Sequence, residues 1–465
     1  MMVRSVNPTT GQVIQEFSAS TPAEISNAVE GARRAFNGVW SISTSEQRIE
    51  LFNNLAQVLN KETDSLLDLI LLEMGKPRSL GAFEIEDIVA GIAYYSSELR
   101  KISPLKFPID DGAYPETNVD LPLVPHGVVG VISPWNFPFW TPMTNIVPAI
   151  MAGNTVVFKP DEHTTLMGLR IKELFDQAGF PQNVINVVIG AEEVGRALVT
   201  SDIDKIVLTG STAAGADALQ HVGIKPALME LGGNDAAIVC KDADLGQAVG
   251  AICWGAVYNA GQACNGVKRV YVHADIAAEF LERSVKYVGQ LQRGRDYGPI
   301  IDAEARSIII QRVQDALQHG ARLISQMDLP IHEGFWLDPI IIHYADDNLE
   351  LVSKETFGPV IPIRVVTSTE EAIRLANGTG FGLGASVWTS DIRAGQEIGM
   401  KLQAKMVCIN EALVNLPGGE YWGGWRNSGV PNTENRLLSF LKRKLLFTHF
   451  GSTPRSWWFP ADFQP

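Results

Sequence analysis

The pattern of hydrophobic and polar positions changes partway along the chain. Residues 44–107 carry apolar residues at helical spacing beside charged faces, which predicts long amphipathic helices. From residue 127 onward, short β-branched runs alternate with helical stretches. The runs GVVGVIS, NTVVFKP, NVINVVIG and DKIVLTGS predict buried parallel strands, and HTTLMGLRIKELFDQAG and EEVGRALVTS between them predict helices. This alternation favours an α/β fold with a doubly wound sheet.

A second series of strands and helices follows Leu231. DAAIVC and KRVYVH predict strands, and they flank an uncharged helix expected from Leu245 to Tyr258. A further helix is expected near Ala277 to Leu291. The simplest account of this series is a second α/β unit. The glycine-rich stretch LPGGEYWGG then leads to a short helix and an aromatic tail.

Length and composition agree with two or more domains. The chain has 465 residues, of which 46% are hydrophobic and 19% charged, as in ordinary globular proteins. A net charge of −14 repels phosphate backbones, so nucleic acid is not expected as a partner. The four cysteines lack the CxxC spacing of a metal site and are too few for a disulfide scaffold. We therefore expect no metal and a cytoplasmic location.

The stretch from Leu121 to Phe158 contains no charged residue and is long enough to span a bilayer. Six prolines interrupt it, and repeated proline would leave a lipid-exposed helix without its backbone hydrogen bonds. We interpret the stretch as a buried core segment, with no role at a membrane. The N-terminus lacks the apolar core and cleavage site of a signal peptide.

Glycine-rich turns are the first candidates for chemistry. GSTAAG, from Gly210 to Gly215, directly follows a predicted strand. Free backbone N–H groups at the start of the next helix would suit a pyrophosphate. The spacing is not GxGxxG, and no lysine marks a phosphate-binding Walker loop, so an ordinary strand-to-helix turn is equally compatible. GTGFGLG, from Gly378 to Gly384, follows no strand and is interpreted as structural.

Several polar residues follow predicted strands, where open α/β sheets bind ligands. Asn136 lies between prolines in ISPWNFPFW, where its amide could face a developing oxyanion or simply bind loop backbone. Lys159 ends VVFKP and could contact ribose or phosphate oxygens, or remain solvated. Glu230 in MELGGN could act as a base or bind nearby backbone N–H groups. KETFGPV, with Glu355 and Phe357, is a polar turn that is also compatible with a plain loop.

Together with the cysteine in GQAC, these segments occur in a familiar order. ISPWNFP, FKPDE, LTGSTAAG, MELGGN, GQAC, KETFGPV and YWGGWRNSG resemble the motifs of the NAD(P)-dependent aldehyde dehydrogenase superfamily. The resemblance runs from about Val6 to about Phe447, which is nearly the whole chain. It implies an aldehyde-dehydrogenase-like fold, with a Rossmann-type cofactor domain, an α/β catalytic domain and a small oligomerisation arm.

The resemblance also implies a reaction and its residues. Cys264 matches the nucleophile, Asn136 matches the oxyanion partner that acts with the backbone N–H of Cys264, and Glu230 matches the base. The implied reaction oxidises an aldehyde to a carboxylic acid through a thiohemiacetal and a thioester on the cysteine. Cofactor contacts are implied for a longer set of residues: Trp135, Lys159, Glu162, Gly210, Ser211, Gly215, Leu231, Glu355 and Phe357. We expect NAD to be preferred over NADP, because Glu162 and its neighbour Asp161 would meet the 2′-phosphate with like charge.

The domain boundaries implied by the resemblance are as follows. Residues 1–110 and 127–228 form the cofactor-binding domain, to which 412–440 return, and 229–411 form the catalytic domain. Residues 111–126 and 441–465 form the oligomerisation arm and tail, so a homodimer or homotetramer is expected.

Some segments depart from the family pattern. After Asn427-Ser428-Gly429 the family continues Gly-Arg-Glu, whereas this chain reads VPNTENR, which puts any secondary proton relay there in doubt. The tail, with its WWFP run, is longer than expected. Trp140 and Trp422 fall where the family's substrate tunnel is lined, which favours an apolar or aromatic entrance. No arginine is placed to bind a substrate carboxylate.

Three other functions remain to be weighed. A coenzyme A-acylating dehydrogenase typically lacks the base, so the presence of Glu230 argues against it. A cysteine hydrolase would need a histidine partner, and none of the eight histidines lies in a matching motif. An inactive structural homologue would not be expected to keep Asn136, Glu230 and Cys264 together.

Overall fold

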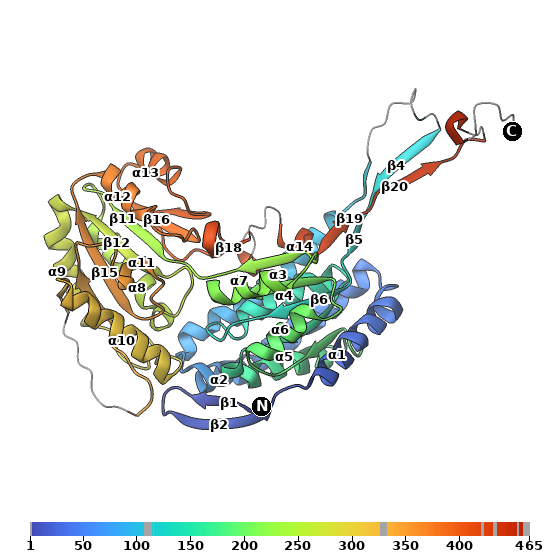
Figure 1. The fold of residues 1–465 in the computed structure, drawn as a ribbon, viewed down its shortest axis with the longest axis horizontal. Coiled ribbons are helices and arrows are strands. Elements are labelled where there is room, and N and C mark those ends of the chain that lie inside the picture. The colour runs from blue at the N-terminus through green and yellow to red at the C-terminus, as the bar shows by residue number, and fades with distance from the viewer. Residues whose placement is uncertain are drawn as a thin grey trace.

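The computed structural model describes residues 2–106, 114, 116–325, 333–419, 423–430, 435–452 and 455–458. Two sheets form two separate lobes, and a narrow β arm projects from one of them (Figure 1). Trp422, most of VPNTENR and the end of the tail lie outside the described residues.

The first lobe contains a six-stranded sheet with the order β18-β10-β9-β6-β7-β8. All neighbours are parallel except β18 and β10. The α/β sheet expected from the sequence is therefore confirmed. Its strands are β6 (Val128–Ile132), β7 (Thr155–Lys159), β8 (Ile185–Val187), β9 (Lys205–Thr209), β10 (Ala227–Glu230) and β18 (Gly429–Val430).

Helices cover both faces of this sheet because its strands are apolar on both sides. Val128 packs with residues of α1 and α6, whereas Val129 and Val131, whose side chains point to the other face, pack with residues of α2 to α5. The helices of this lobe are α1 (Pro22–Ala35), α2 (Ser45–Met74), α3 (Arg78–Lys101), α4 (Trp140–Met151), α5 (Thr165–Gln177), α6 (Glu192–Thr200), α7 (Thr212–His221) and α14 (Arg436–Ser439).

The second lobe contains a seven-stranded sheet with the order β13-β14-β15-β12-β11-β16-β17. It confirms the second α/β unit. Its strands are β11 (Asp235–Val239), β12 (Val267–His273), β13 (Arg322–Leu323), β14 (Ile340–His343), β15 (Val360–Val366), β16 (Gly384–Trp388) and β17 (Met406–Ile409). Its helices are α8 (Leu245–Val257), α9 (Ala277–Val288), α10 (Ala303–Gln318), α11 (Glu350–Ser353), α12 (Thr369–Ala376) and α13 (Ile392–Gly399). Helix α9 ends three residues earlier than expected, just before Gly289.

The chain crosses between the lobes through the short segment from Leu231 to Asn234, which joins β10 to β11. Two glycines are required there by close approach. A Cβ on Gly232 would lie 2.1 Å from a carboxylate oxygen of Glu355, and one on Gly233 would lie 2.2 Å from the carbonyl oxygen of Cys264. The Gly-Gly corner of MELGGN therefore brings residues of both lobes close to one another.

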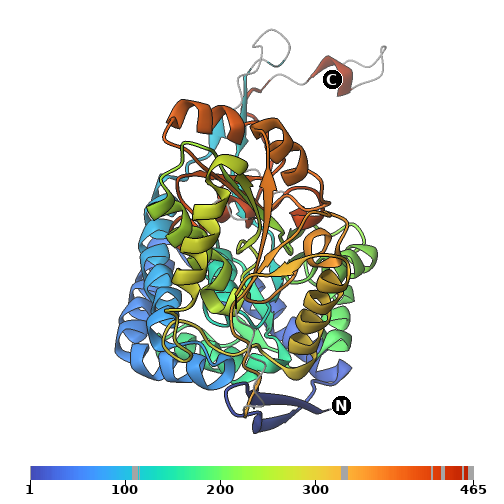
Figure 2. The same cartoon turned by 90° about the vertical axis from the view of Figure 1, so that its left-hand side faces the viewer.

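The arm consists of β3 (Leu105–Lys106), β4 (Thr117–Leu121) and β20 (Leu446–His449), which pair antiparallel. Strands β5 (Leu123–Pro125) and β19 (Leu441–Arg443) pair at its base, and β1 (Met2–Asn7) and β2 (Gln12–Ser18) form a hairpin near the N-terminus. Figure 2, viewed at right angles to Figure 1, again shows the arm extending away from both lobes. The domain boundaries given above remain a prediction.

The uncharged stretch from Leu121 to Phe158 forms β5, β6, α4 and most of β7. Every residue of α4 is buried, which accords with a core segment. Among the helices that the structure describes, none combines the length and apolar character needed to cross a bilayer.

Candidate active site

A cavity of about 520 Å³ opens at the carboxyl ends of β6, β9 and β10. The chain runs from β6 outward to β7 and β8 and then returns to place β9 on the other side of β6. The cavity therefore lies beside a topological switch point, where open α/β sheets bind ligands. Cys264, Glu230 and Asn136 all line it. The structure thus brings the three predicted catalytic residues together.

Cys264 reaches the cavity through a sharply turned segment that follows α8. Asn259, Ala260 and Gly261 all have positive φ angles, of 54°, 55° and 71°. Such a run is costly for the two residues that carry a Cβ, and it persists only where the surroundings fix it. At Gly261 a Cβ would lie 2.0 Å from the carbonyl oxygen of Gly358. The turn therefore needs glycine there, and it leads the chain back toward the cavity at Cys264.

The environment of Cys264 favours the neutral thiol at neutral pH. Burial raises its pKa to about 12, and the negative charges of Glu355, Asp235 and Glu230 add to the effect. A thiolate is the reactive form, so the proton must leave before or during attack on a carbonyl carbon. Cys240 and Cys253 also have pKa values raised by burial, to about 11 and 12, and neither lines this cavity.

Asn136 is held through its side chain and through its backbone. Its side-chain nitrogen donates to the carbonyl oxygen of Gln262 at 3.1 Å, and its backbone carbonyl oxygen accepts from the side chains of Asn259 and Lys76, both at 2.9 Å. An amide nitrogen carries two hydrogens, and within the described part of the chain only one of them is engaged. The second is available to an oxygen atom in the cavity.

Lys76 and Glu84 form a fully buried ion pair beneath this segment, with 0% of either side chain exposed. The second carboxylate oxygen of Glu84 accepts from the backbone N–H groups of Phe139 and Trp140, at 3.1 and 3.0 Å. The ammonium group lies 4.0 Å from the ring centroid of Phe137. The pair therefore ties α3 to the whole loop that carries Asn136. No sequence motif marks this pair.

Glu230 is also held by a buried ion pair, and no sequence motif marks its partner. One carboxylate oxygen accepts from Arg436 at 2.5 Å, and the other accepts from the hydroxyl of Thr209 at 3.0 Å. The side chains of Arg436 and Glu230 are 1% and 3% exposed. Arg436 is the last residue of the VPNTENR segment, which departs from the family pattern. That departure is the one feature of the sequence that pointed to this part of the chain.

The cofactor side of the cavity is formed by Trp135, Gly210, Ser211, Leu231, Glu355 and Phe357, all of which were predicted as cofactor contacts. Ser211 caps α7 by accepting from the N–H of Ala214 at 3.1 Å. The N–H groups of the first turn of α7 therefore begin at the cavity wall, where an anion would be stabilised. The rings of Trp135 and Phe357 meet edge to face, with centroids 5.6 Å apart.

Glu355 lies on the far wall, from the second lobe. Burial raises its pKa to about 7, although Lys268, the N–H of Gly233 and Arg312 act in the opposite direction. Its charge therefore changes close to neutral pH. Lys268 is buried as well, and its ammonium group lies 5.3 Å from the ring centroid of Phe357.

Lys159 and Glu162 lie at the end of β7, one strand away from β6, and neither lines the cavity. The ammonium group of Lys159 is 3.8 Å from a carboxylate oxygen of Glu162. Burial and the neighbouring charge of Asp161 raise the pKa of Glu162, and Lys159 opposes them.

Gly215 does not line the cavity either. A Cβ there would lie 2.4 Å from the side chain of Leu231, so this glycine allows α7 to pack against Leu231.

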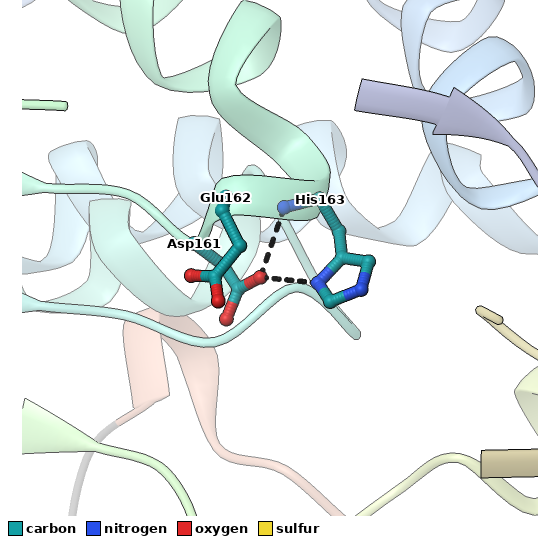
Figure 3. A group of neighbouring side chains, drawn as sticks. All are labelled: Asp161, Glu162 and His163. Atoms are coloured by element: carbon teal, nitrogen blue, oxygen red, sulfur yellow. Dashed lines mark hydrogen bonds and ion pairs between the residues drawn. The ribbon is translucent and has the colours of Figure 1, made fainter. Parts of the chain in front are cut away.

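His163 is the third member of a polar cluster with Asp161 and Glu162, shown in Figure 3. Its ring nitrogens bond to Asp161 at 2.7 Å and, in the second lobe, to Asp302 at 3.1 Å. Burial would lower its pKa, but these bonds and the nearby carboxylate charges raise it to about 10. The oxygen and nitrogen atoms of these three side chains lie within 4.8 Å of one another, as the ligands of a metal ion would. A protonated imidazole with both nitrogens engaged has no lone pair to offer a metal ion, so His163 is not a ligand in this arrangement.

One part of the cavity wall is formed by a continuous series of aromatic rings. Successive centroids are 6.0 Å apart for Phe83 and Trp140, 6.1 Å for Trp140 and Phe137, 6.0 Å for Phe137 and Tyr258, and 5.1 Å for Tyr258 and Trp254. Among the described lining residues, the only charged ones are Glu230 and Glu355. The wall is therefore apolar and contains no cation.

Comparisons with known proteins agree on one family. The aldehyde dehydrogenase family model matches residues 1–444. The chain is 30% identical over 486 residues to aminoaldehyde dehydrogenase 1, peroxisomal, of Pisum sativum, covering 99% of this chain and 95% of the relative. It is 33% identical over 467 residues to a Saccharomyces cerevisiae aldehyde dehydrogenase named for NAD(P)+, covering 94% and 90%. Betaine aldehyde dehydrogenase from Staphylococcus aureus, solved in complex with NAD+, superposes with a TM-score of 0.93 at 28% identity over 99% and 94% of the two chains.

Proposed function

The chain belongs to the aldehyde dehydrogenase family, and on that premise we propose that Cys264, Glu230 and Asn136 carry out its reaction. The activity is the oxidation of an aldehyde to a carboxylic acid with reduction of NAD(P), of the non-acylating type. The observation that carries the residue assignment is their convergence on one cavity beside the α7 N-terminus.

The residues divide the reaction between them. The sulfur of Cys264 adds to the aldehyde carbon, and the thiol proton passes to solvent water. The amide of Asn136 and the backbone N–H of Cys264 donate to the resulting oxyanion. Loss of hydride from the carbon leaves a thioester on Cys264. Glu230 then accepts a proton from water, the water oxygen attacks the thioester carbon, and the sulfur departs as the acid forms.

The residues around the cavity fit a nicotinamide dinucleotide, whose chemistry is to accept the hydride. The N–H groups at the start of α7 suit its pyrophosphate, and the Glu355 carboxylate suits ribose hydroxyl groups. Trp135 and Phe357 supply an apolar surface that excludes water near the reacting carbon.

The preferred cofactor is NAD rather than NADP. The carboxylates of Asp161 and Glu162 lie together at the end of β7, where a ribose 2′-phosphate would bring like charge. Lys159, at 3.8 Å from Glu162, and the protonated His163 beside Asp161 offset part of that repulsion, so the preference is expected to be no more than roughly tenfold.

The substrate is an aldehyde with an apolar or aromatic body. The series of five aromatic rings offers a large apolar surface. The described lining residues include no cation that could bind the carboxylate of a carboxylated aldehyde. Purified protein assayed by NADH absorbance against a panel of aldehydes tests the function and the substrate together. Higher kcat/KM for arylaldehydes than for short, carboxylated or trimethylammonium aldehydes is expected. Aromatic faces also bind trimethylammonium groups. A preference for the trimethylammonium aldehyde would therefore mean that the rings bind a cation, and it would contradict the proposed apolar substrate.

The protein is a homodimer or homotetramer that assembles through the arm and acts in the cytoplasm. Apolar side chains are exposed on the arm and tail, among them Leu446, Phe447, Trp457 and Trp458. Surfaces of this kind favour contact with another chain. All four cysteines are free, which supports a reducing compartment. Light scattering after size-exclusion chromatography, with Phe447→Asp as the test variant, distinguishes an oligomer from a monomer.

A further inference from the structure

Arg436 contacts the proposed base and no sequence motif assigned it a role. Its guanidinium donates to three acceptors from three separate segments: Glu230 on β10 at 2.5 Å, Asn145 on α4 at 2.7 Å, and the carbonyl oxygen of Gly419 at 2.9 Å. Arg436 is 1% exposed. A planar guanidinium with acceptors on three sides is fixed in place, so it defines where the Glu230 carboxylate lies.

A buried carboxylate needs a partner of opposite charge to stay ionised. Arg436 supplies that charge at one oxygen of Glu230, and the hydroxyl of Thr209 occupies the other. Within the described part of the chain, Lys405, which is half-buried, and Cys264 also interact electrostatically with Glu230. Arg436 is the charged residue that contacts the carboxylate directly.

We propose that Arg436 is a positioning residue for deacylation, a role that rests on the proposed function of Glu230 as the base. The ion pair fixes the orientation of the Glu230 carboxylate before water attacks the thioester. When a water proton moves to Glu230, the charge pairing with Arg436 is lost. The proton leaves Glu230 for solvent once the acid has left, and the ion pair forms again for the next turnover.

The test isolates the deacylation step without cofactor. A 4-nitrophenyl ester acylates Cys264 and releases nitrophenol; after removal of excess ester, intact mass spectrometry follows loss of the acyl group to water. In Arg436→Met the acylated fraction is expected to match the unmodified protein, while the acyl group is lost roughly tenfold or more slowly, because the base is no longer held in place. Arg436→Lys should restore part of the rate, since an ammonium group keeps the charge but not the fork geometry.

Two further variants show whether Arg436 acts through Glu230. Glu230→Gln should slow deacylation, and Arg436→Met combined with Glu230→Gln should slow it no further than Glu230→Gln alone. The control is Arg48→Met. Arg48 lies on α2 and also makes partly buried hydrogen bonds, but none of them is to a residue of the proposed active site. The rate of deacylation in this variant should be unchanged.

Each result leads to a different conclusion. Normal deacylation in Arg436→Met, together with slow deacylation in Glu230→Gln, would overturn the role of Arg436 and leave the proposed function intact. Normal deacylation in Glu230→Gln would instead contradict the proposed base. If Arg436→Met does not fold, the test passes to Arg436→Lys and to the double variant, which has no unpaired buried carboxylate. An unchanged rate in Arg436→Lys would then overturn the proposal.

Discussion

Replacing Lys76 by methionine is expected to destabilise the protein by about 3–5 kcal/mol, because it leaves the buried carboxylate of Glu84 without its cation. Neither side chain of this pair is exposed to solvent. Two backbone N–H groups, from Phe139 and Trp140, would remain as the partners of Glu84. They compensate only part of the lost charge, which places the expected cost well above that of a surface ion pair.

The double variant Lys76→Met/Glu84→Gln provides the sharper measurement. Glutamine keeps an oxygen that accepts from the same N–H groups but carries no charge. The combined loss should therefore be smaller than the sum of the two single losses by about 2–3 kcal/mol. Urea unfolding followed by tryptophan fluorescence measures all three variants. Lys172→Met is the matched control, because Lys172 pairs with Asp176 on the surface at 36% and 53% exposure, and it should cost less than about 1 kcal/mol.

The same variants should affect catalysis, because Lys76 also donates to the carbonyl oxygen of Asn136. Loss of that donor loosens the loop that aims the Asn136 amide, so kcat should fall roughly tenfold or more in Lys76→Met. If the two single losses simply add, or if Lys76→Met costs less than about 1 kcal/mol, the reasoning about a buried, coupled pair would be refuted.

Three further outcomes are expected. In Glu162→Ser the ratio of kcat/KM for NAD to that for NADP should narrow toward unity, and equal use of both cofactors by the unmodified protein would contradict the argument. His163 has a folded pKa of about 10, above its ordinary value of 6.5, so its contribution to stability is complete below pH 6.5 and disappears as pH rises through 10. Unfolding free energies of the unmodified protein and His163→Gln should therefore differ by about 2–4 kcal/mol at pH 6 and converge near pH 10. Because Glu355 has a pKa of about 7, titration calorimetry should show NAD binding weakening roughly tenfold from pH 8 to pH 6, and Glu355→Gln should remove that dependence.

The sequence was most informative where function depends on local segments. Strand ends place Asn136 and Glu230, and the Gly-Gly corner after Glu230 is needed because backbone and carboxylate atoms from the second lobe approach within contact distance. Such features leave a local trace as prolines, glycines and β-branched runs. For this reason the two α/β units could be predicted from one chain, whereas the cavity residues were selected by the resemblance to a known family.

The supporting charges could not be predicted in the same way. Arg436 and Glu230 are 206 positions apart, and His163 and Asp302 are 139 apart. In the sequence each is an ordinary charged residue of a kind that usually remains solvated. Lys76 and Glu84 are close in sequence, but they lie in a region whose charges mostly face solvent, so nothing marks this pair as buried. Only the packing of separate segments reveals these contacts.

The most direct test of the central claim is to identify the covalent intermediate. Glu230→Gln protein is mixed with NAD and an arylaldehyde, stopped in acid, digested and examined by mass spectrometry. The account predicts that the peptide containing Cys264 gains the mass of the aldehyde less two hydrogens, as a thioester requires, and that Cys264→Ala shows neither this adduct nor NADH formation. An adduct on Cys240, Cys253 or Cys408, or substantial turnover by Cys264→Ala, would contradict it.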